Sequence, residues 1–234
     1  MPLQVHPDIR SLSPYVPGKP IDELQRELGL TRIIKLASNE NPLGPSPKAV
    51  AALSGAQDTL HRYPDGGAYQ LRRALADRWK VTQERVILGN GSDEIIGLLA
   101  RTFLAPGDEA VMADHTFVIY KMEVTAVHGR PVIVPLVDWT HDLESMVQAI
   151  TPRTRLLFLC NPNNPTGSLT PSGELYEFVL RHPATSFLVD ESYLPFTREK
   201  SLLHYDLPPN LFVLFSSSKI YGIPGLRLGF LVAR

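Results

Sequence analysis

The sequence predicts an α/β fold, a three-layer sandwich with a mostly parallel central sheet. Short and almost continuously apolar segments, such as "RLLFLC" and "LFVLF", recur along the 234 residues. Such segments are typical of strands that are buried on both faces. Helical segments separate most of them, and this alternation places helices on both faces of a parallel sheet. Hydrophobic residues make up 44% of the chain, which is enough for a sizeable core.

The elements follow in a regular order after an irregular, proline-rich beginning. In "YQLRRALADRW" the residues Leu71, Leu75 and Trp79 are four apart, so they would share one face of a helix. The next helix, "SDEIIGLLARTF", is expected to begin with Ser92 as its N-cap, followed by two acidic residues. Further helices are expected over 117–127, 142–150 and 171–181, and strands over 85–89, 109–113, 130–136, 155–160, 186–190, 211–215 and 227–233.

Composition and charge exclude several classes of protein. Lysine and arginine together number 23 and the acidic residues 24, for a net charge of -1, so a nucleic-acid or anionic-membrane partner is not expected. The single cysteine, Cys160, excludes an intrachain disulfide framework and a cysteine-rich metal site. No stretch approaches the length of a membrane span, and the start lacks the apolar region of a signal peptide. We therefore expect a cytoplasmic enzyme.

Ligands of parallel sheets bind beyond the carboxyl ends of the strands, so the residues that follow each strand are the candidates. "GNGSDE" (89–94) leads into a helix, and its open backbone N–H groups indicate an anion site, although a plain helix cap fits equally well. Phe117 could stack on a flat ligand or belong to the core. In "NPNNPTG" (161–167) the prolines would stiffen the turn and hold the amide of Asn164 in one direction.

Acidic and basic residues follow the last strands of the predicted sheet. Asp190 ends an apolar strand, so it would be partly buried and would need a cationic partner. A nucleotide hydrolase is excluded because the chain lacks a Gly-x-x-x-x-Gly-Lys-[Ser/Thr] loop. Lys219 follows the strand over 211–215, and Arg227 comes eight residues later.

Together these residues suit pyridoxal 5'-phosphate. Its aldehyde needs a lysine for a Schiff base, which Lys219 offers, and its ring nitrogen needs a carboxylate such as Asp190. Asn164 and Tyr193 could hydrogen-bond the ring oxygen. Lys219, once released, could carry a proton. The phosphate would be bound by backbone N–H groups of Ser92, Asp93 and Glu94 and by Ser216, Ser218 and Arg227.

The motifs "SNENPLGPSP", "RYPDG", "GNGSDE", "NPNNPTG", "DESY" and "SSSK…GLRLGF" resemble the signatures of the histidinol-phosphate aminotransferase family, within the fold-type I pyridoxal-phosphate enzymes. The resemblance extends from about Tyr15 to Arg234. It implies that 1–35 form an N-terminal arm and the start of a small domain, and that 36–234 form the large cofactor-binding domain.

The resemblance also implies roles for individual residues. Lys219 would be the Schiff-base lysine, Asp190 the partner of the ring nitrogen, and Phe117 the stacking aromatic. Tyr63 would reach the cofactor phosphate of a neighbouring subunit, which implies a homodimer. The reaction would move an amino group from an amino donor to a 2-oxo acid. The ring-oxygen contacts would be Asn164 and Tyr193, and Tyr15 and Asn39 would lie near the substrate.

The chain also departs from the pattern of the family. Members continue beyond the "GLRLGF" strand, and that part supplies most of the small domain and an arginine for the substrate carboxylate. A chain that ends at Arg234 is expected to bind the cofactor but to transaminate poorly. The segment "KIYGIPGLR" is similar to threonine-phosphate decarboxylases as well. A decarboxylase and a non-catalytic cofactor-binding protein therefore remain alternatives, and these residues leave the substrate open.

Overall fold

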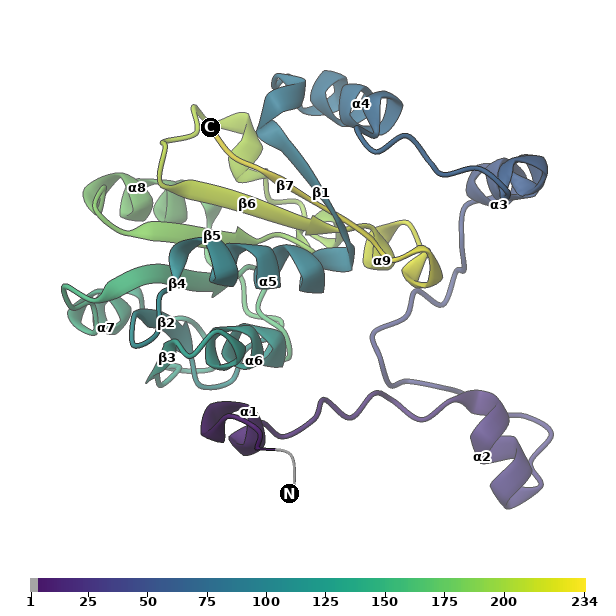
Figure 1. Cartoon of the computed structure of the whole chain (residues 1–234), viewed down its shortest axis with the longest axis horizontal. Helices are drawn as coiled ribbons and strands as arrows, with labels where there is room; N and C mark the ends of the chain where they lie inside the picture. The colour runs from purple at the N-terminus through teal and green to yellow at the C-terminus, as the bar shows by residue number, and fades with distance from the viewer. Residues whose placement is uncertain (1–3) are drawn as a thin grey trace.

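A seven-stranded sheet forms the centre of the computed structural model, which describes residues 4–234. Its strands lie in the order β1-β7-β6-β5-β4-β2-β3. Only β7 runs against its neighbours, β1 and β6, so the predicted mostly parallel sheet is confirmed (Figure 1). The strands are β1 (Val86–Asn90), β2 (Glu109–Ala113), β3 (Arg130–Val134), β4 (Thr154–Cys160), β5 (Ser186–Asp190), β6 (Leu211–Ser216) and β7 (Leu228–Val232).

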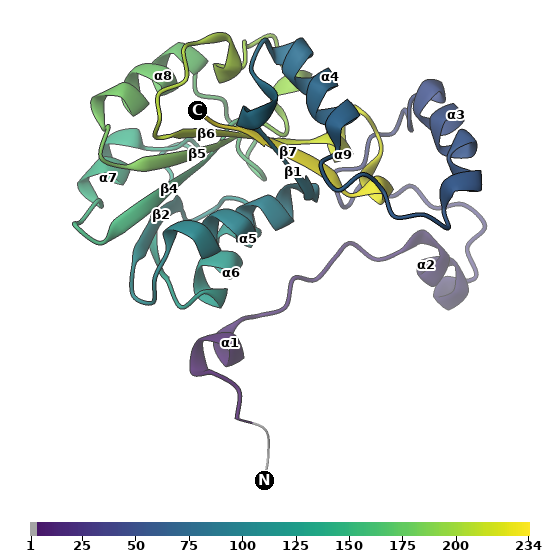
Figure 2. The same ribbon diagram turned by 45° about the horizontal axis from the view of Figure 1, so that its top comes forward.

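Helices cover both faces of the sheet and complete the predicted three layers. Figure 2 shows α4 and α8 above the sheet and α5 and α6 below it. Each predicted helix is present within one or two residues of its expected bounds. The helices of this part are α4 (Tyr69–Trp79), α5 (Gly91–Phe103), α6 (Val118–Ala126), α7 (Leu143–Gln148), α8 (Ser172–Arg181) and the short α9 (Ser217–Ile220).

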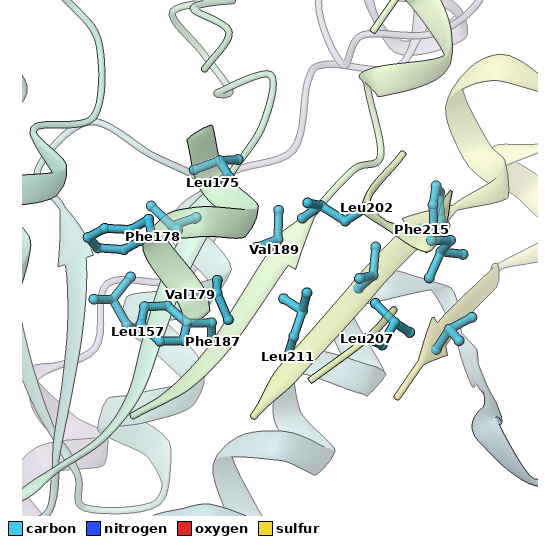
Figure 3. Close-up of a cluster of buried hydrophobic side chains, with 14 of the residues drawn as sticks. Leu157, Leu175, Phe178, Val179, Phe187, Val189, Leu202, Leu207, Leu211 and Phe215 are labelled. Carbon is cyan, nitrogen blue, oxygen red and sulfur yellow. The ribbon is translucent and has the colours of Figure 1, made fainter. Parts of the chain in front are cut away.

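The core is divided by the sheet into two apolar clusters. Alternate residues of β4 point to opposite faces of the sheet. Leu157 and Leu159 belong to the cluster between the sheet and helices α7 and α8, and Leu156 and Phe158 belong to the cluster between the sheet and helices α5 and α6. Figure 3 shows the first cluster, in which residues of α8 pack onto β5 and β6. Burial of each such leucine or phenylalanine side chain contributes about 1.5–3 kcal/mol. The strands are therefore held from both sides.

The start of α5 differs from the sequence prediction. Asn90, not Ser92, is the N-cap, and Ser92 lies inside the first turn. The expected serine cap is therefore wrong. Gly91 adopts a φ of 82°, in the left-handed region that glycine tolerates, so the chain can turn sharply from β1 into α5. The carboxylate of Glu94 accepts the backbone N–H of Asn90 at 2.6 Å, which is a contact with the residue before the helix and not a cap on the N–H groups of its first turn.

The N-terminal part of the chain lies apart from the sheet. Its helices α1 (Pro7–Ser11), α2 (Ile21–Leu28) and α3 (Pro47–Gly55) contain no buried residue, and Figures 1 and 2 both show α2 and α3 away from the central layers. Leu36 and Leu43 are 89% and 92% exposed. The domain boundary expected after residue 35 stays a prediction. Within residues 4–234, no helix has the length and apolar character needed to cross a membrane.

Candidate active site

A cavity of about 560 Å³ lies at the carboxyl edge of the sheet and collects almost all of the predicted site residues. Glu94 and Tyr63 do not line it: the Glu94 carboxylate accepts the backbone N–H of Asn90, and Tyr63 is fully exposed on the N-terminal part. A larger hollow, of about 830 Å³, borders α7 and α8 and contains none of the predicted residues. The predicted residues that line the first cavity are Tyr15, Asn39, Ser92, Asp93, Phe117, Asn164, Asp190, Tyr193, Ser216, Ser218, Lys219 and Arg227.

The reversed direction of β7 explains how Arg227 reaches this edge. Arg227 precedes β7, and β7 begins where β1 and β6 end, as the pairs Leu228–Asn90 and Gly229–Ser216 show. The guanidinium Nη2 of Arg227 lies 3.3 Å from a carboxylate oxygen of Asp93, in the first turn of α5. A residue that comes before a strand is thus placed beside residues that follow other strands.

Glycines keep the beginning of α5 close to β7. A Cβ atom at Gly91 would collide with the guanidinium of Arg227, and a Cβ atom at Gly229 would lie 2.6 Å from the backbone nitrogen of Ser92. The first backbone N–H groups of a helix have no partner within the helix, and the helix dipole makes this end positive. With Arg227 beside them, these N–H groups form a cradle for an anionic group. Ser216 and Ser218 line the same side of the sheet edge.

Asp190 is buried without a cationic partner. Its side chain accepts the backbone N–H of Ser192 at 2.9 Å and the hydroxyl of Tyr120 at 2.9 Å. Burial raises the pKa of Asp190, and the hydrogen bonds from Ser192 and Tyr120 act in the opposite direction. The cation that the sequence leads us to expect is not paired with Asp190 anywhere in residues 4–234. Because Asp190 lines the cavity, that cation can come from a ligand.

Asn39 joins the two residues predicted to contact the ring oxygen. Its Nδ2 donates to Tyr193 Oη at 2.9 Å and to Asn164 Oδ1 at 3.4 Å. The Nδ2 group of Asn164 and the hydroxyl hydrogen of Tyr193 are thereby left as donors. Burial raises the pKa of Tyr193, so the phenol keeps its proton. Two donors therefore lie close together on one side of the cavity.

Lys219 lies in α9, at the end of β6. Burial lowers the pKa of its amine, and the charge of Arg227 acts in the same direction, whereas Asp93 opposes the shift. A lowered pKa increases the neutral fraction of the amine, which is the nucleophilic form. The Nζ atom donates to the backbone oxygen of Ser38 at 3.4 Å and lies 5.7 Å from the ring centre of Tyr193. The lysine therefore points across the cavity.

Two residues of this site were missed by the sequence prediction. Tyr120 is fully buried and donates to Asp190, but its position in an apolar helix makes it look like core. Asn41 donates through Nδ2 to the backbone oxygens of Lys219 and Ile220, at 3.2 and 3.4 Å. It lies in the quoted motif "SNENPLGPSP", but nothing local indicates a contact with a segment about 180 residues away.

Comparison with known proteins supports the predicted resemblance. The model of the family "Aminotransferase class I and II" matches residues 31–234. Histidinol-phosphate aminotransferase from Moorella thermoacetica is 49% identical over 234 residues, which cover 96% of this chain and 60% of the relative. The chain therefore spans less than two thirds of the length of this relative.

Solved structures show the same fold. Histidinol-phosphate aminotransferase from Sinorhizobium meliloti, in complex with pyridoxal-5'-phosphate, superposes with a TM-score of 0.89 at 28% identity, over 98% of this chain and 63% of that one. For L-threonine-O-3-phosphate decarboxylase from Porphyromonas gingivalis the TM-score is 0.76 at 27% identity, over 86% of this chain and 60% of that one. The sequence and structural similarities agree, and the chain belongs to the aminotransferase class I and II family.

Proposed function

We propose that this chain is the cofactor-binding part of a pyridoxal-phosphate-dependent aminotransferase, which moves an amino group between an amino donor and a 2-oxo acid. The observation that carries the proposal is the position of Lys219 and Asp190 on one cavity, with Asp190 buried and lacking a cation. The family match and the cofactor named for the Sinorhizobium meliloti structure support it.

The residues of the cavity fit each part of the cofactor. The Asp190 carboxylate would receive the protonated ring nitrogen as its missing cation. The N–H groups at the start of α5, with Arg227, Ser216 and Ser218, would hold the phosphate. The donors of Asn164 and Tyr193 would bind the ring oxygen, and Phe117 would pack on the ring. The volume of about 560 Å³ lies in the usual range of cofactor sites.

The cofactor supplies an electron sink for the substrate carbanion, and the residues of this chain control charge and proton position. Asp190 would hold a proton at the ring nitrogen. The neutral amine of Lys219, which its lowered pKa favours, would hold the cofactor aldehyde. Nζ of Lys219 would also serve as the base that moves the proton at the substrate Cα atom.

Tyr120 contacts both Asp190 and Phe117. Its hydroxyl donates to Asp190 Oδ2, and its ring meets the ring of Phe117 edge to face, with centroids 5.6 Å apart. Burial raises the pKa of Tyr120 well above its ordinary value, so the phenol remains a donor. One side chain therefore orients both the acid beneath the ring nitrogen and the aromatic ring that would stack on the cofactor.

A histidinol-phosphate type of substrate is the choice that the named relatives favour. The similarity to the Porphyromonas gingivalis decarboxylase keeps decarboxylation as the second candidate. Release of CO₂ from a phosphorylated amino acid, compared with amino transfer to a 2-oxo acid, distinguishes the two reactions. The expected cytoplasmic location stays a prediction.

A homodimer is the assembly that the N-terminal part favours. Leu43, Leu60 and Tyr63 are 92%, 81% and 101% exposed, which is unusual for large apolar side chains of one region. A second copy that covers this surface would bring Tyr63 to the neighbouring active site, as the family resemblance implies. Sedimentation equilibrium at micromolar concentration should give twice the mass of one chain. A single-chain mass at that concentration would contradict the proposal.

Replacing Lys219 by alanine should abolish covalent attachment of the cofactor. We expect the wild-type protein with pyridoxal phosphate to be yellow, to be bleached by borohydride, and then to carry the cofactor mass on the peptide that contains Lys219. Lys219→Ala and Lys219→Arg should both lose this label, because neither offers a nucleophilic amine. Lys121→Ala, on the exposed side of α6, is the control. A label on another lysine would refute the assignment.

Removing the Tyr120 hydroxyl should weaken cofactor binding. A hydrogen bond to a charged group is worth about 1.5–3 kcal/mol, so Tyr120→Phe should raise the dissociation constant of pyridoxal phosphate by roughly 10- to 100-fold. Tyr176→Phe is the matched control, since its hydroxyl donates to the backbone oxygen of Asp206 at 2.8 Å, far from the cavity. Absorbance titration measures both constants. An unchanged constant in Tyr120→Phe would show that Asp190 does not need this donor.

A further inference from the structure

We propose that His6, Asp8 and His128 bind a divalent metal ion of the zinc type, which fastens the N-terminal arm to the end of helix α6. Two imidazoles and one carboxylate are a ligand set that zinc accepts. His6 and Asp8 lie at the beginning of α1, and His128 follows α6. Asp8 and His128 are 120 positions apart in the sequence. Neither the family resemblance nor the proposed aminotransferase reaction uses any of the three residues.

The ligand atoms already lie at distances that suit a metal. His128 Nδ1 is 3.1 Å from Asp8 Oδ2, and His6 Nδ1 is 3.5 Å from the same oxygen. All three atoms lie within 4.8 Å of one another. In a tetrahedral zinc site with bonds of about 2.0–2.1 Å, neighbouring ligand atoms are roughly 3.3 Å apart. Two of the three separations match this value, and water can complete the coordination.

The present contacts of His6 allow its ring to bind a metal ion. Its Nδ1 accepts the backbone N–H of Asp8 at 3.3 Å, which is a long hydrogen bond that a metal would replace. The rings of His6 and His128 lie with centroids 3.8 Å apart and are tilted by 47°. Both rings therefore already face the Asp8 carboxylate without a rearrangement of the backbone.

One side of the cluster is rigid and the other is weakly held. The backbone of His128 is fixed, since its N–H donates to Thr125 at 3.0 Å and its oxygen accepts from Gly107 at 2.9 Å. Helix α1, by contrast, has no buried residue. In Figures 1 and 2 it lies beneath α6, joined to α2 by an extended segment. A metal bound to His6, Asp8 and His128 would supply the attachment that apolar packing does not.

The attachment has a consequence for the candidate active site. The extended segment after α1 contains Tyr15, which lines the cavity. Fixing α1 against α6 therefore limits the positions of Tyr15 at the mouth of the site. Binding of the metal should order the arm as far as this residue, whether or not the proposed aminotransferase reaction takes place.

Calorimetric titration of the metal-free protein, loaded with pyridoxal phosphate, with Zn²⁺ alone tests the site. One ion should bind per chain, and Asp8→Asn and His128→Ala should each weaken its binding at least tenfold. His115→Ala is the matched control: His115 pairs with Asp114 at 3.0 Å, but among residues 4–234 no third metal-ligating side chain joins them, so binding should be unchanged. Since the ligands lie at the surface, these variants should keep their fold, which circular dichroism checks.

Hydrogen exchange provides a second measurement that does not depend on activity or on the cofactor. Zn²⁺ should slow the exchange of backbone amides in residues 4–18 of the wild-type protein at least several-fold, and should leave the same amides of His128→Ala unchanged. Equal affinity of the wild type and His128→Ala for Zn²⁺ would overturn the proposal. So would an arm whose exchange is the same with and without the ion. Both outcomes can be distinguished from failure of the aminotransferase proposal, which is tested at Lys219.

Discussion

The buried carboxylate of Asp190 is the constraint around which the edge of the sheet is organised. A charge removed from water is costly unless it is paired, and within residues 4–234 Asp190 has no cationic partner and accepts hydrogen bonds from Ser192 and from the Tyr120 hydroxyl. Two neutral donors orient the carboxylate but do not balance its charge. The protonated ring nitrogen of pyridoxal phosphate would balance this charge. The unpaired charge of the buried carboxylate would therefore contribute to the affinity for the cofactor.

The sheet topology brings the other groups to this acid. Because six strands end at one edge and β7 begins there, Lys219, the start of α5 and Arg227 meet although they come from different connections. The glycines at 91 and 229 let helix and strand approach closely. The anion cradle and the amine thus line the same cavity, as a ligand with a phosphate and an aldehyde requires.

Much of the fold was predictable because its signals are local. Apolar segments of five to seven residues marked all seven strands, and the stretches between or before them marked α4, α5, α6, α7 and α8, whereas the short α9 was not predicted. The residues after each strand led to the site, since parallel strands end at a common edge. The N-cap of α5 was mispredicted: Asn90 holds this position without a side-chain cap, and Ser92 lies inside the first turn.

Contacts between distant segments could not be read from local patterns. Tyr120 and Asn41 contact Asp190 and Lys219 across long stretches of sequence, and neither has a local feature that distinguishes it from a core or loop residue. The same holds for His6 and His128. The side chains that adjust a site are found only once the chain is folded, whereas those that end or follow a strand, such as Asp190 and Lys219, can be found beforehand.

A crystal structure of the protein with bound pyridoxal phosphate tests the central claim most directly. We expect the ring nitrogen within about 3 Å of an Asp190 carboxylate oxygen, and electron density continuous from the cofactor to Nζ of Lys219. A ring nitrogen that faces solvent or another residue, with Asp190 still bonded only to Ser192 and Tyr120, would contradict the account.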